Sequence, residues 1–395
     1  MTIVTDRDIK NEAHWKDLFN EWLIRADTTY LNHGSFGPTP EFVRLARRKW
    51  IDQLDCQPMD FYVRQLEDAL WEARGTTAEF VGTNAENLIF AENATAGMNV
   101  VANSFPLKPG DEILSYNHEY GAVHRIWQRR CDQTGAELKV CVLPEQFESK
   151  QQVIDCVANS VTANTRLVIV SHITSPTALI MPVKEITKAL QDKGVAVCVD
   201  GPHGPAHVDV DIDSIGCDFY TASCHKWLCA TLGSGFLFVH PKRHANIEPP
   251  IKSWGRMLPA MPERWDEEFT WSGTRDPSPY LSIPAAIEFM NDKVGLETFR
   301  ARSRYLASAA EEMLSEEFGT KPIAPRDEGW YASMAHVPLP GGDHSELQQC
   351  LWNEYQIEVP IIHFENRWFV RVSCHLYNNL KQLETLRLAL RKFMI

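Results

Sequence analysis

Residues 198–204 read CVDGPHG, and residues 219–227 read FYTASCHKW. Each stretch joins a short apolar run, typical of a buried strand, to polar side chains at the end of that run. The first run ends at Asp200, and the second leads to Lys226. Neighbouring strands that deliver a carboxylate and an amine suit a pyridoxal phosphate (PLP) enzyme. In such an enzyme the lysine holds the aldehyde as a Schiff base, and the aspartate keeps the pyridine nitrogen protonated.

Strand-like and helical segments alternate around these two stretches. The strand-like runs fall at 87–90, 112–116, 138–143, 166–173, 195–200, 218–222 and 235–240. Helical stretches such as 95–104 and 183–192 lie between several of them. The alternation predicts an α/β fold in which helices flank a mostly parallel, seven-stranded sheet on both faces.

The predicted sheet belongs to a large PLP-binding domain over residues 31–284. Residues 1–30 are expected to form an N-terminal helical segment, with an amphipathic helix over 8–25, that packs with a small domain. The small α+β domain is expected over 285–395. Its predicted elements are a helical run at 285–318, strands at 332–337, 357–360 and 368–373, and a closing helix at 380–393.

The composition excludes several classes of function. The 395 residues carry a net charge of -13, which disfavours nucleic acid and anionic membranes as partners, because both require basic patches. No apolar run approaches the length of a bilayer span, and the charged N-terminus lacks the apolar core of a signal peptide. The ten cysteines show neither a CxxC pair nor zinc-type spacing, so no metal site is expected. We interpret them as reduced thiols of a cytoplasmic protein.

Polar residues near the two strand ends are candidates for holding the cofactor. Ser223 and His225 can donate hydrogen bonds to a phosphate, or they can cap a turn. Asp200 lies where ligands bind in α/β sheets, although Asp before Gly is also a common turn residue. His203 can hydrogen-bond the phenolic oxygen of the cofactor, or it can serve as a structural donor.

Three further places offer cofactor or substrate contacts. Residues 93–99, NATAGMN, open a helix whose free N–H groups suit a phosphate, although many helices begin with such caps. This segment is neither GxGxxG nor GxxxxGK[ST], so a nucleotide site lacks its fingerprint. Tyr120 can stack on the cofactor or pack in the core. Arg371 alternates with apolar residues and needs an anion, either a substrate carboxylate or an internal salt bridge.

Eight motifs together resemble the class V aminotransferase family of fold-type I PLP enzymes, and most closely its isopenicillin N epimerase group. They are LNHGSFG at 31–37, NAT at 93–95, HEY at 118–120, SHITSPT at 171–177, DGPH at 200–203, SCHK at 223–226, GTRD at 273–276, and RVS at 371–373 followed by Tyr377 and Asn378. Each motif is modest alone, and their shared order along nearly the whole chain makes the resemblance specific.

The resemblance implies roles around the cofactor. Lys226 would be the Schiff-base lysine and proton carrier, and Asp200 would be the partner of the pyridine nitrogen. Thr274 would reach the phosphate of the neighbouring subunit, so a homodimer is expected. The residues implied at the phosphate within one subunit are Ala94, Thr95, Ser223 and His225.

The ring of the cofactor is expected to have its own neighbours. The resemblance implies that Tyr120 stacks on the ring, where the cysteine desulfurase branch of the family carries histidine. His203 would lie near the phenolic oxygen, where the family often has glutamine. Either Thr174 or Ser175 would be another neighbour of that oxygen.

At the substrate, the resemblance implies that Arg371 clamps the carboxylate of an amino acid and that Asn32 and His33 line the mouth of the site. Desulfurases of this family carry a nucleophilic cysteine on a loop shortly before the arginine strand. Residues 360–368, PIIHFENRW, contain no cysteine. A persulfide-forming desulfurase is therefore disfavoured.

We expect an enzyme that acts on an amino acid through a Lys226 aldimine and an α-carbanion. The leading hypothesis is an epimerase, in which a second acid, Tyr120 or His33, returns the proton to the opposite face. The nearest alternative is a C–S β-lyase acting on a cysteine conjugate, and transamination is a third outcome. A non-catalytic PLP-binding protein and a nucleotide-dependent oxidoreductase are the alternatives from other classes.

Overall fold

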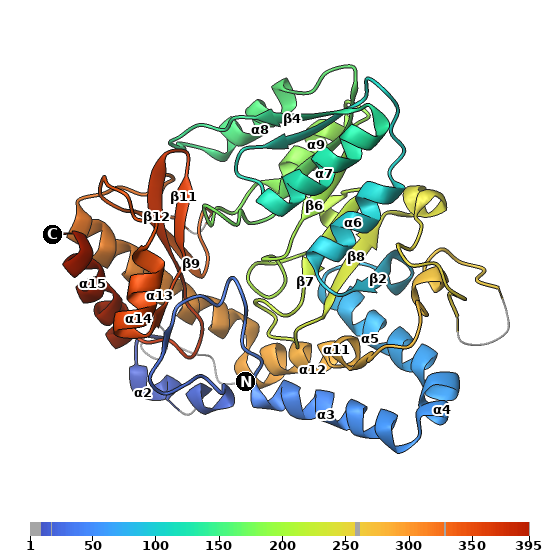
Figure 1. The fold of residues 1–395 in the computed structure, drawn as a ribbon, viewed down its shortest axis with the longest axis horizontal. Helices are drawn as coiled ribbons and strands as arrows, with labels where there is room; N and C mark the ends of the chain where they lie inside the picture. The colour runs from blue at the N-terminus through green and yellow to red at the C-terminus, as the bar shows by residue number, and fades with distance from the viewer. Residues whose placement is uncertain (1–8, 17, 257–260, 328, 395) are drawn as a thin grey trace.

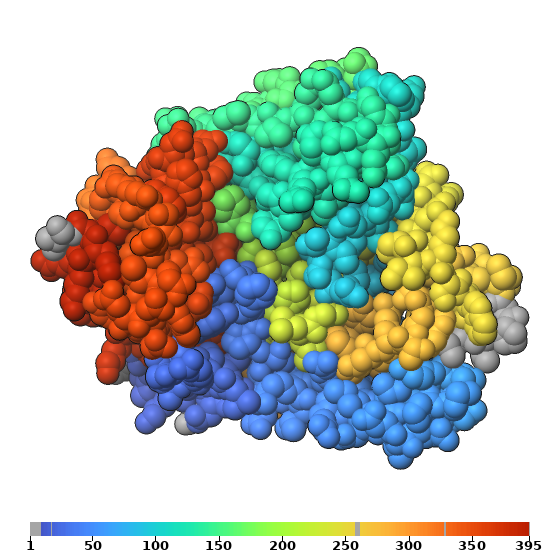
Figure 2. Space-filling view, viewed as in Figure 1, coloured from blue at the N-terminus to red at the C-terminus, as the bar shows by residue number. Residues whose placement is uncertain are grey.

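The computed structural model describes residues 9–16, 18–256, 261–327 and 329–394. A large sheet with covering helices fills most of the molecule, and the C-terminal segments, in orange and red, gather at one side (Figure 1). The surface is hollowed between these C-terminal segments and the cyan and teal segments of the centre (Figure 2). None of the helices in the described ranges is both long enough and apolar enough to cross a bilayer.

The large sheet contains seven strands in the order β2-β8-β7-β6-β5-β3-β4. Their bounds are β2 Leu88–Ala91, β3 Glu112–Tyr116, β4 Glu137–Cys141, β5 Thr165–Ser171, β6 Ala196–Asp200, β7 Phe219–Ser223 and β8 Gly235–Val239. Strand β8 runs antiparallel to β2 and β7, and the other neighbours are parallel. All seven predicted strands are confirmed within two residues at each end, and so is the α/β fold class.

Helices cover both faces of this sheet, so every residue of β6, β7 and β8 is buried. The predicted helices at 95–104 and 183–192 are confirmed as α6 and α9. In Figure 1, α3 runs along the lower edge of the molecule, below α11 and α12. The bounds are α3 Glu41–Cys56, α4 Pro58–Asp60, α5 Leu66–Phe80, α6 Ala94–Ser104, α7 Gly121–Thr134, α8 Lys150–Asn159, α9 Val183–Gln191, α10 Ile212–Ile215, α11 Ser278–Leu281 and α12 Ile283–Glu288.

The C-terminal part holds a three-stranded antiparallel sheet in the order β11-β12-β9. Its elements are β9 Met334–Pro338, β11 Ile361–Phe364, β12 Arg367–Ser373, α13 Leu296–Phe318, α14 Leu347–Tyr355 and α15 Leu380–Met394. The predicted strands at 332–337 and 368–373 and the closing helix are confirmed, whereas the sequence prediction lacks β11 and α14. Glu365 and Asn366 form the turn that connects β11 to β12. Their φ values of 47° and 62° are typical of a type I′ hairpin turn.

The helix predicted over 8–25 is wrong. The described residues of this segment include a short helix, α2 Glu12–Trp15, and a 3-10 turn, Leu18–Glu21, rather than one continuous helix, while residues 8 and 17 lie outside the described ones. The chain then turns inward, because Trp22 is buried and its indole N–H donates to the Pro38 carbonyl at 3.0 Å. Burial of single aromatic side chains, rather than one amphipathic face, therefore determines the path of this segment.

The helical run predicted over 285–318 is also wrong as one element. A π-helical turn, Phe289–Val294, follows α12, and Gly295 separates it from α13. Gly295 has a φ of 85°, in the region that favours glycine, so it ends one helix and begins the next.

The N-terminal segment contacts the C-terminal part of the molecule. Strand β1, Thr29–Tyr30, pairs in parallel with β10, Ile357–Glu358, at the predicted strand 357–360. The buried Arg302 of α13 donates to the Ile9 carbonyl and to the Glu12 carboxylate. These contacts accord with the predicted packing of residues 1–30, and the domain boundaries themselves stay predictions.

Gly97 determines how closely α6 approaches the sheet. A Cβ atom at this position would lie 2.1 Å from Oγ1 of the buried Thr221 on β7. We expect Gly97→Ala to lower the free energy of unfolding by about 1–3 kcal/mol, because overpacking displaces the helix. Gly75→Ala on α5 is the matched control, since nothing lies within 4 Å of its added Cβ and alanine favours a helix. Equal midpoints in urea unfolding for the two variants would contradict this argument.

Candidate active site

A cavity of about 420 Å³ lies at the carboxyl ends of β6 and β7, the edge of an α/β sheet at which ligands bind. Its wall also includes the loop at 34–36, the N-terminus of α6 and a side chain from β12. Ten predicted site residues line it: Ala94, Thr95, Tyr120, Ser175, Asp200, His203, Ser223, His225, Lys226 and Arg371.

The amine of Lys226 lies in this cavity against a histidine. Lys226 Nζ is 3.1 Å from His203 Nε2, and His203 Nδ1 accepts a hydrogen bond from the Trp227 indole at 3.1 Å. Because an indole nitrogen only donates, a neutral His203 carries its proton on Nε2 and donates it to the lysine amine. Burial, reinforced by the charge of Arg371, lowers the pKa of Lys226 to about 7, against the opposing effect of Asp200. The amine is therefore available as a neutral nucleophile near pH 7.

The main chain at Lys226 is fixed by the glycine-containing loop at 31–37. His33 Nε2 donates to the Lys226 carbonyl at 3.1 Å, and His33 Nδ1 accepts from the Tyr377 hydroxyl at 2.8 Å. Gly37 packs so closely that a Cβ would lie 2.7 Å from the same carbonyl oxygen. His33 is fully buried behind Lys226, and burial lowers its pKa to about 3. The structure therefore does not place His33 at the mouth of the cavity, where it was expected.

Asp200 is buried at the end of β6, with an exposed fraction of 3%. Burial raises its pKa, while the positive charge of Lys226 lowers it, and its side chain has no hydrogen bond from the described residues. A buried carboxylate without such a partner is energetically costly. The protonated ring nitrogen of a cofactor would supply the missing donor.

The N-terminus of α6 faces the same cavity. The Ala94 N–H donates to Ser223 Oγ at 3.0 Å, and the exposed Thr95 follows it. His225 Nδ1 is buried and has no hydrogen-bond partner among the described residues. A helix N-terminus, two hydroxyls and an imidazole nitrogen without a partner together suit an anion such as a phosphate.

Arg371 enters the cavity wall from β12 and is 5% exposed. Its Nη1 donates to the Ser175 carbonyl at 2.5 Å, and its Nη2 donates to Ser35 Oγ at 2.8 Å. The buried Nε has no partner, and no carboxylate of the described residues forms an ion pair with this guanidinium. Burial lowers the pKa of Arg371 to about 10, so it remains charged. The internal salt bridge is thus absent from the described residues, and the guanidinium can bind an external carboxylate.

Three other predicted residues do not line this cavity. Asn32 donates to Glu358 at 3.1 Å and lines a neighbouring pocket of about 820 Å³. Thr174 is fully buried and bonds within its own loop, so Ser175 is the member of that pair at the cavity. Thr274 is exposed and is absent from the lining of this cavity. The roles expected for these residues stay predictions.

Two residues of the site were not predicted from the sequence. Ser35 anchors Arg371 although the two are 336 positions apart in the chain. Glu119 is a buried acid directly before Tyr120. A carboxylate beside an apolar run was the available signal for Glu119, whereas Ser35 offered no signal beyond its place in the glycine-containing motif.

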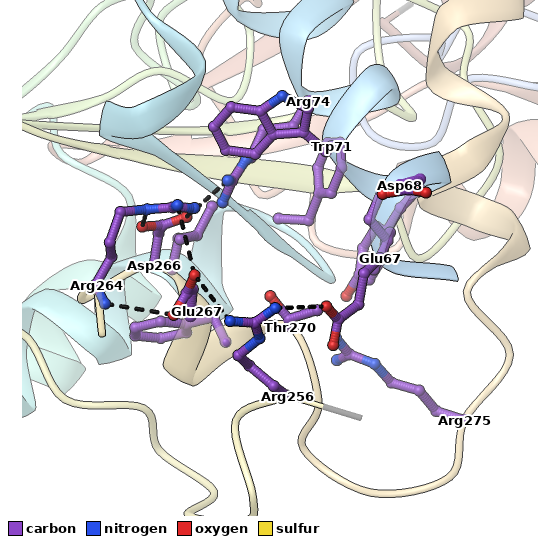
Figure 3. A pocket seen from close by; sticks show the side chains of 15 residues that line it. Glu67, Asp68, Trp71, Arg74, Arg256, Arg264, Asp266, Glu267, Thr270 and Arg275 are labelled. Carbon is purple, nitrogen blue, oxygen red and sulfur yellow. Dashed lines mark hydrogen bonds and ion pairs between the residues drawn. The ribbon is translucent and has the colours of Figure 1, made fainter. Parts of the chain in front are cut away.

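A second cavity, of about 220 Å³, lies between α5, Arg256 and residues 264–275 (Figure 3). Its charged side chains contact one another: Arg74 pairs with Asp266 at 2.6 Å, and Arg256 pairs with Glu67 at 3.2 Å. Charges that neutralise each other in this way indicate a structural network rather than a catalytic acid and base.

One buried group in the described part of the chain has metal-ligand chemistry, His33, Cys229 and His375, with its ligand atoms within 4.8 Å of one another. The two imidazole rings stack at 4.0 Å, and Cys229 Sγ lies 3.4 Å from His375 Nε2. Since His33 Nε2 already donates to the Lys226 carbonyl, these contacts support the loop from behind.

The sequence model described as aminotransferase class-V matches residues 59–386. The chain belongs to the class V aminotransferase family. Isopenicillin N epimerase of Streptomyces clavuligerus is 32% identical over 390 residues, with 96% of this chain and 98% of that protein covered. The isopenicillin N epimerase of Amycolatopsis lactamdurans is 33% identical with the same coverage. L-cysteine desulfhydrase of Arabidopsis thaliana is 26% identical, with 99% and 92% covered.

Solved structures share the class V fold. The cysteine desulfurase of Thermococcus onnurineus NA1 superimposes with a TM-score of 0.79 at 21% identity, covering 96% of this chain and 98% of that one. The cystine C-S lyase C-DES, in complex with cysteine persulfide, gives a TM-score of 0.78 at 22% identity, covering 93% and 98%. A variant of C-DES carries glycine covalently linked to its PLP cofactor. These likenesses confirm fold-type I.

PLP is the cofactor of this class V enzyme. When bound, it supplies an aldehyde that condenses with amines and a ring that withdraws electrons. The cavity fits it, because it combines a neutral lysine amine, a buried carboxylate without a donor and a helix N-terminus suited to phosphate.

The lowered pKa of Lys226 leads to a pH dependence for cofactor capture. Only the neutral amine attacks an aldehyde, and its fraction grows as the pH rises through a pKa of about 7. We expect covalent PLP incorporation into the apoprotein to accelerate about tenfold per pH unit in the acid range and to level off above about pH 8. Stopped-flow absorbance measures this rate. An amine with the ordinary pKa of 10.5 would keep accelerating beyond that point, and such a profile would contradict the assignment.

Proposed function

We propose that this enzyme is an amino-acid epimerase of the isopenicillin N epimerase type, which removes and returns the α-proton of its substrate. One observation carries the proposal: a buried cation without an anion, Arg371, and a neutral amine, Lys226, line the same cavity. An α-amino acid meets both, because its carboxylate binds the guanidinium and its α-hydrogen faces a base.

The substrate and its proton depend on three side chains in this proposal. Arg371, oriented by Ser35 and Ser175, binds the carboxylate through two N–H groups and so fixes the direction of the Cα–H bond. Lys226 takes the α-proton on Nζ. His203 Nε2 contacts Lys226 Nζ at 3.1 Å. This contact limits the motion of Nζ while it takes and returns the α-proton.

The remaining side chains bind the cofactor in this proposal. Asp200 would keep a negative charge beside the ring nitrogen, Tyr120 would cover the ring, and Ser175 and His203 would be near its phenolic oxygen, since all four line the cavity. The groups proposed at the phosphate are Ala94, Thr95, Ser223 and His225.

Epimerisation needs a second acid, because the proton must return to the other side of Cα. Tyr120 lines the cavity and is 46% exposed, whereas His33 is fully buried behind Lys226. Tyr120 is therefore our candidate for the second acid.

C–S β-lysis of a cysteine conjugate is the second candidate. It is supported by the likeness to L-cysteine desulfhydrase and to the fold of a cystine C-S lyase. Expulsion of a thiol from the β-carbon uses Lys226 alone and needs no second acid. Residues 360–368 lack a cysteine, so this candidate does not include a persulfide carried by the protein.

Reaction in deuterated water separates the two candidates. L-Amino acids and cysteine conjugates are incubated with the enzyme in deuterated water. The products are separated on a chiral column, and their masses are measured by mass spectrometry. Epimerisation yields the D-enantiomer with one α-deuterium. Pyruvate and free thiol without inversion would reject epimerisation and favour β-lysis.

We also propose a homodimer in which Thr274 reaches the phosphate of the neighbouring site. Thr274 is exposed and lies outside the cavity of its own subunit, as this arrangement requires. Sedimentation equilibrium tests the assembly, and a monomer at micromolar concentration would reject it.

The proposal also includes the domain boundaries and the cellular compartment of the protein. A separate core contains Leu306 and Leu386 and supports the proposed small domain over 285–395, beside a large domain over 31–284 and an N-terminal segment over 1–30. All ten cysteines are free thiols, which supports a reducing compartment such as the cytoplasm.

A further inference from the structure

Glu119 connects two parts of the cofactor site without lining the cavity itself. Its Oε1 accepts a hydrogen bond from the Tyr120 N–H at 2.7 Å and another from Ser171 Oγ at 2.7 Å. Ser171 ends β5 and lies in register with Asp200 on β6. The Oε1 atom of Glu119 thus holds the backbone of Tyr120, the proposed ring-stacking residue. It also holds Ser171, which lies beside Asp200, the proposed partner of the ring nitrogen.

The second oxygen of Glu119 has a different environment. Oε2 is buried and has no hydrogen-bond partner among the described residues, while the whole side chain is 4% exposed. The titratable groups that face Glu119 are Tyr116 on β3 and Cys198 and Asp200 on β6. None of these three groups is a cation, so an ionised Glu119 would place a second negative charge beside Asp200.

We propose that Glu119 is a positioning residue that carries a proton on Oε2, so that Asp200 alone holds the negative charge, while its Oε1 orients Tyr120. The inference rests on the proposed place of Asp200 at the ring nitrogen. Burial and the charge of Asp200 both raise the pKa of Glu119, in agreement with a retained proton. With the proton on Glu119, only one of the two buried acids is ionised, and Asp200 can keep its charge for the cofactor.

Two variants of Glu119 separate a retained proton from simple packing. Glu119→Gln keeps the shape and a donor in place of the protonated oxygen, whereas Glu119→Ala removes both. We expect Glu119→Gln to keep cofactor affinity within about threefold of wild type, and Glu119→Ala to lower it about tenfold or more. The pH at which the bound cofactor changes its absorbance should move in Glu119→Ala and stay in place in Glu119→Gln.

Infrared difference spectroscopy of the holoenzyme provides a readout independent of activity. Between neutral and alkaline pH, the wild type should lose a carbonyl stretch of a protonated carboxyl group, and both variants should lack this signal. Ser171→Ala is the control that removes one bond to Oε1 and keeps the proton, so it should keep the signal. A wild type without the signal, or a Glu119→Gln variant as impaired in cofactor binding as Glu119→Ala, would overturn the inference.

Failure of the proposed function is distinguishable from failure of this inference. If Asp200→Asn leaves the cofactor absorbance unchanged, the assignment of Asp200 to the ring nitrogen fails first. If Asp200→Asn changes the absorbance and both Glu119 variants match the wild type, only the role of Glu119 is rejected.

Discussion

Lys226→Ala is expected to lower turnover by about 10³-fold or more on any amino-acid substrate of this enzyme. In the proposed mechanism, the variant loses the amine that takes the α-proton, and it also loses the covalent link to the cofactor. The nearest group, His203, is a poor substitute base, because burial lowers its pKa well below the usual range. Initial rates with wild type and variant, both saturated with PLP, measure the loss.

Lys188→Ala is the matched control for this prediction. Lys188 is exposed on α9, outside the cavity, so its removal should leave turnover unchanged. A Lys226→Ala variant that keeps more than about a tenth of wild-type turnover would be incompatible with a catalytic lysine.

The second large effect is expected at Arg371. Arg371→Gln should lower kcat/KM by about 10²- to 10³-fold, because it removes the charge that, in the proposed mechanism, binds the substrate carboxylate in a buried site. Arg371→Lys should recover only part of this loss, since an ammonium group lacks the planar pair of N–H donors. Steady-state kinetics measures both, and the absorbance of the bound cofactor should change little.

Ser35, which accepts a hydrogen bond from Arg371, provides a control with a smaller expected loss of activity. Ser35→Ala removes the 2.8 Å bond to Nη2 and leaves the charge, so it should cost less than Arg371→Gln. If Arg371→Gln bound amino acids as tightly as wild type, the guanidinium would not be the carboxylate clamp.

The sheet was predictable from the sequence because its strands are buried on both faces. Runs such as AVCVD in β6 and FYTAS in β7 are apolar or β-prone throughout and end in polar residues, so their type and limits are visible locally. The wrong predictions concern segments whose secondary structure depends on tertiary contacts or on an unusual turn. Burial of Trp22 breaks the N-terminal helix, and a turn of positive φ at Glu365 and Asn366 creates β11.

The site was predictable in part, for a similar reason. Asp200 and Lys226 follow strand ends, and the α6 N-terminus follows β2, so the topology brings them together. His33 shows the limit of this reasoning, because a histidine in a glycine-containing loop can face the cavity or the core. The bonds of Ser35 to Arg371 and of Glu119 to Ser171 join distant segments, which local patterns do not reveal.

The proposed mechanism requires that the cofactor be bound covalently through the side-chain nitrogen of Lys226. The holoenzyme is treated with borohydride, digested, and its peptides are sequenced by mass spectrometry. We predict a single peptide, containing Lys226, that carries the mass of a reduced phosphopyridoxyl group on that side chain. A label on a different lysine, or unlabelled protein after saturation with PLP, would contradict the account.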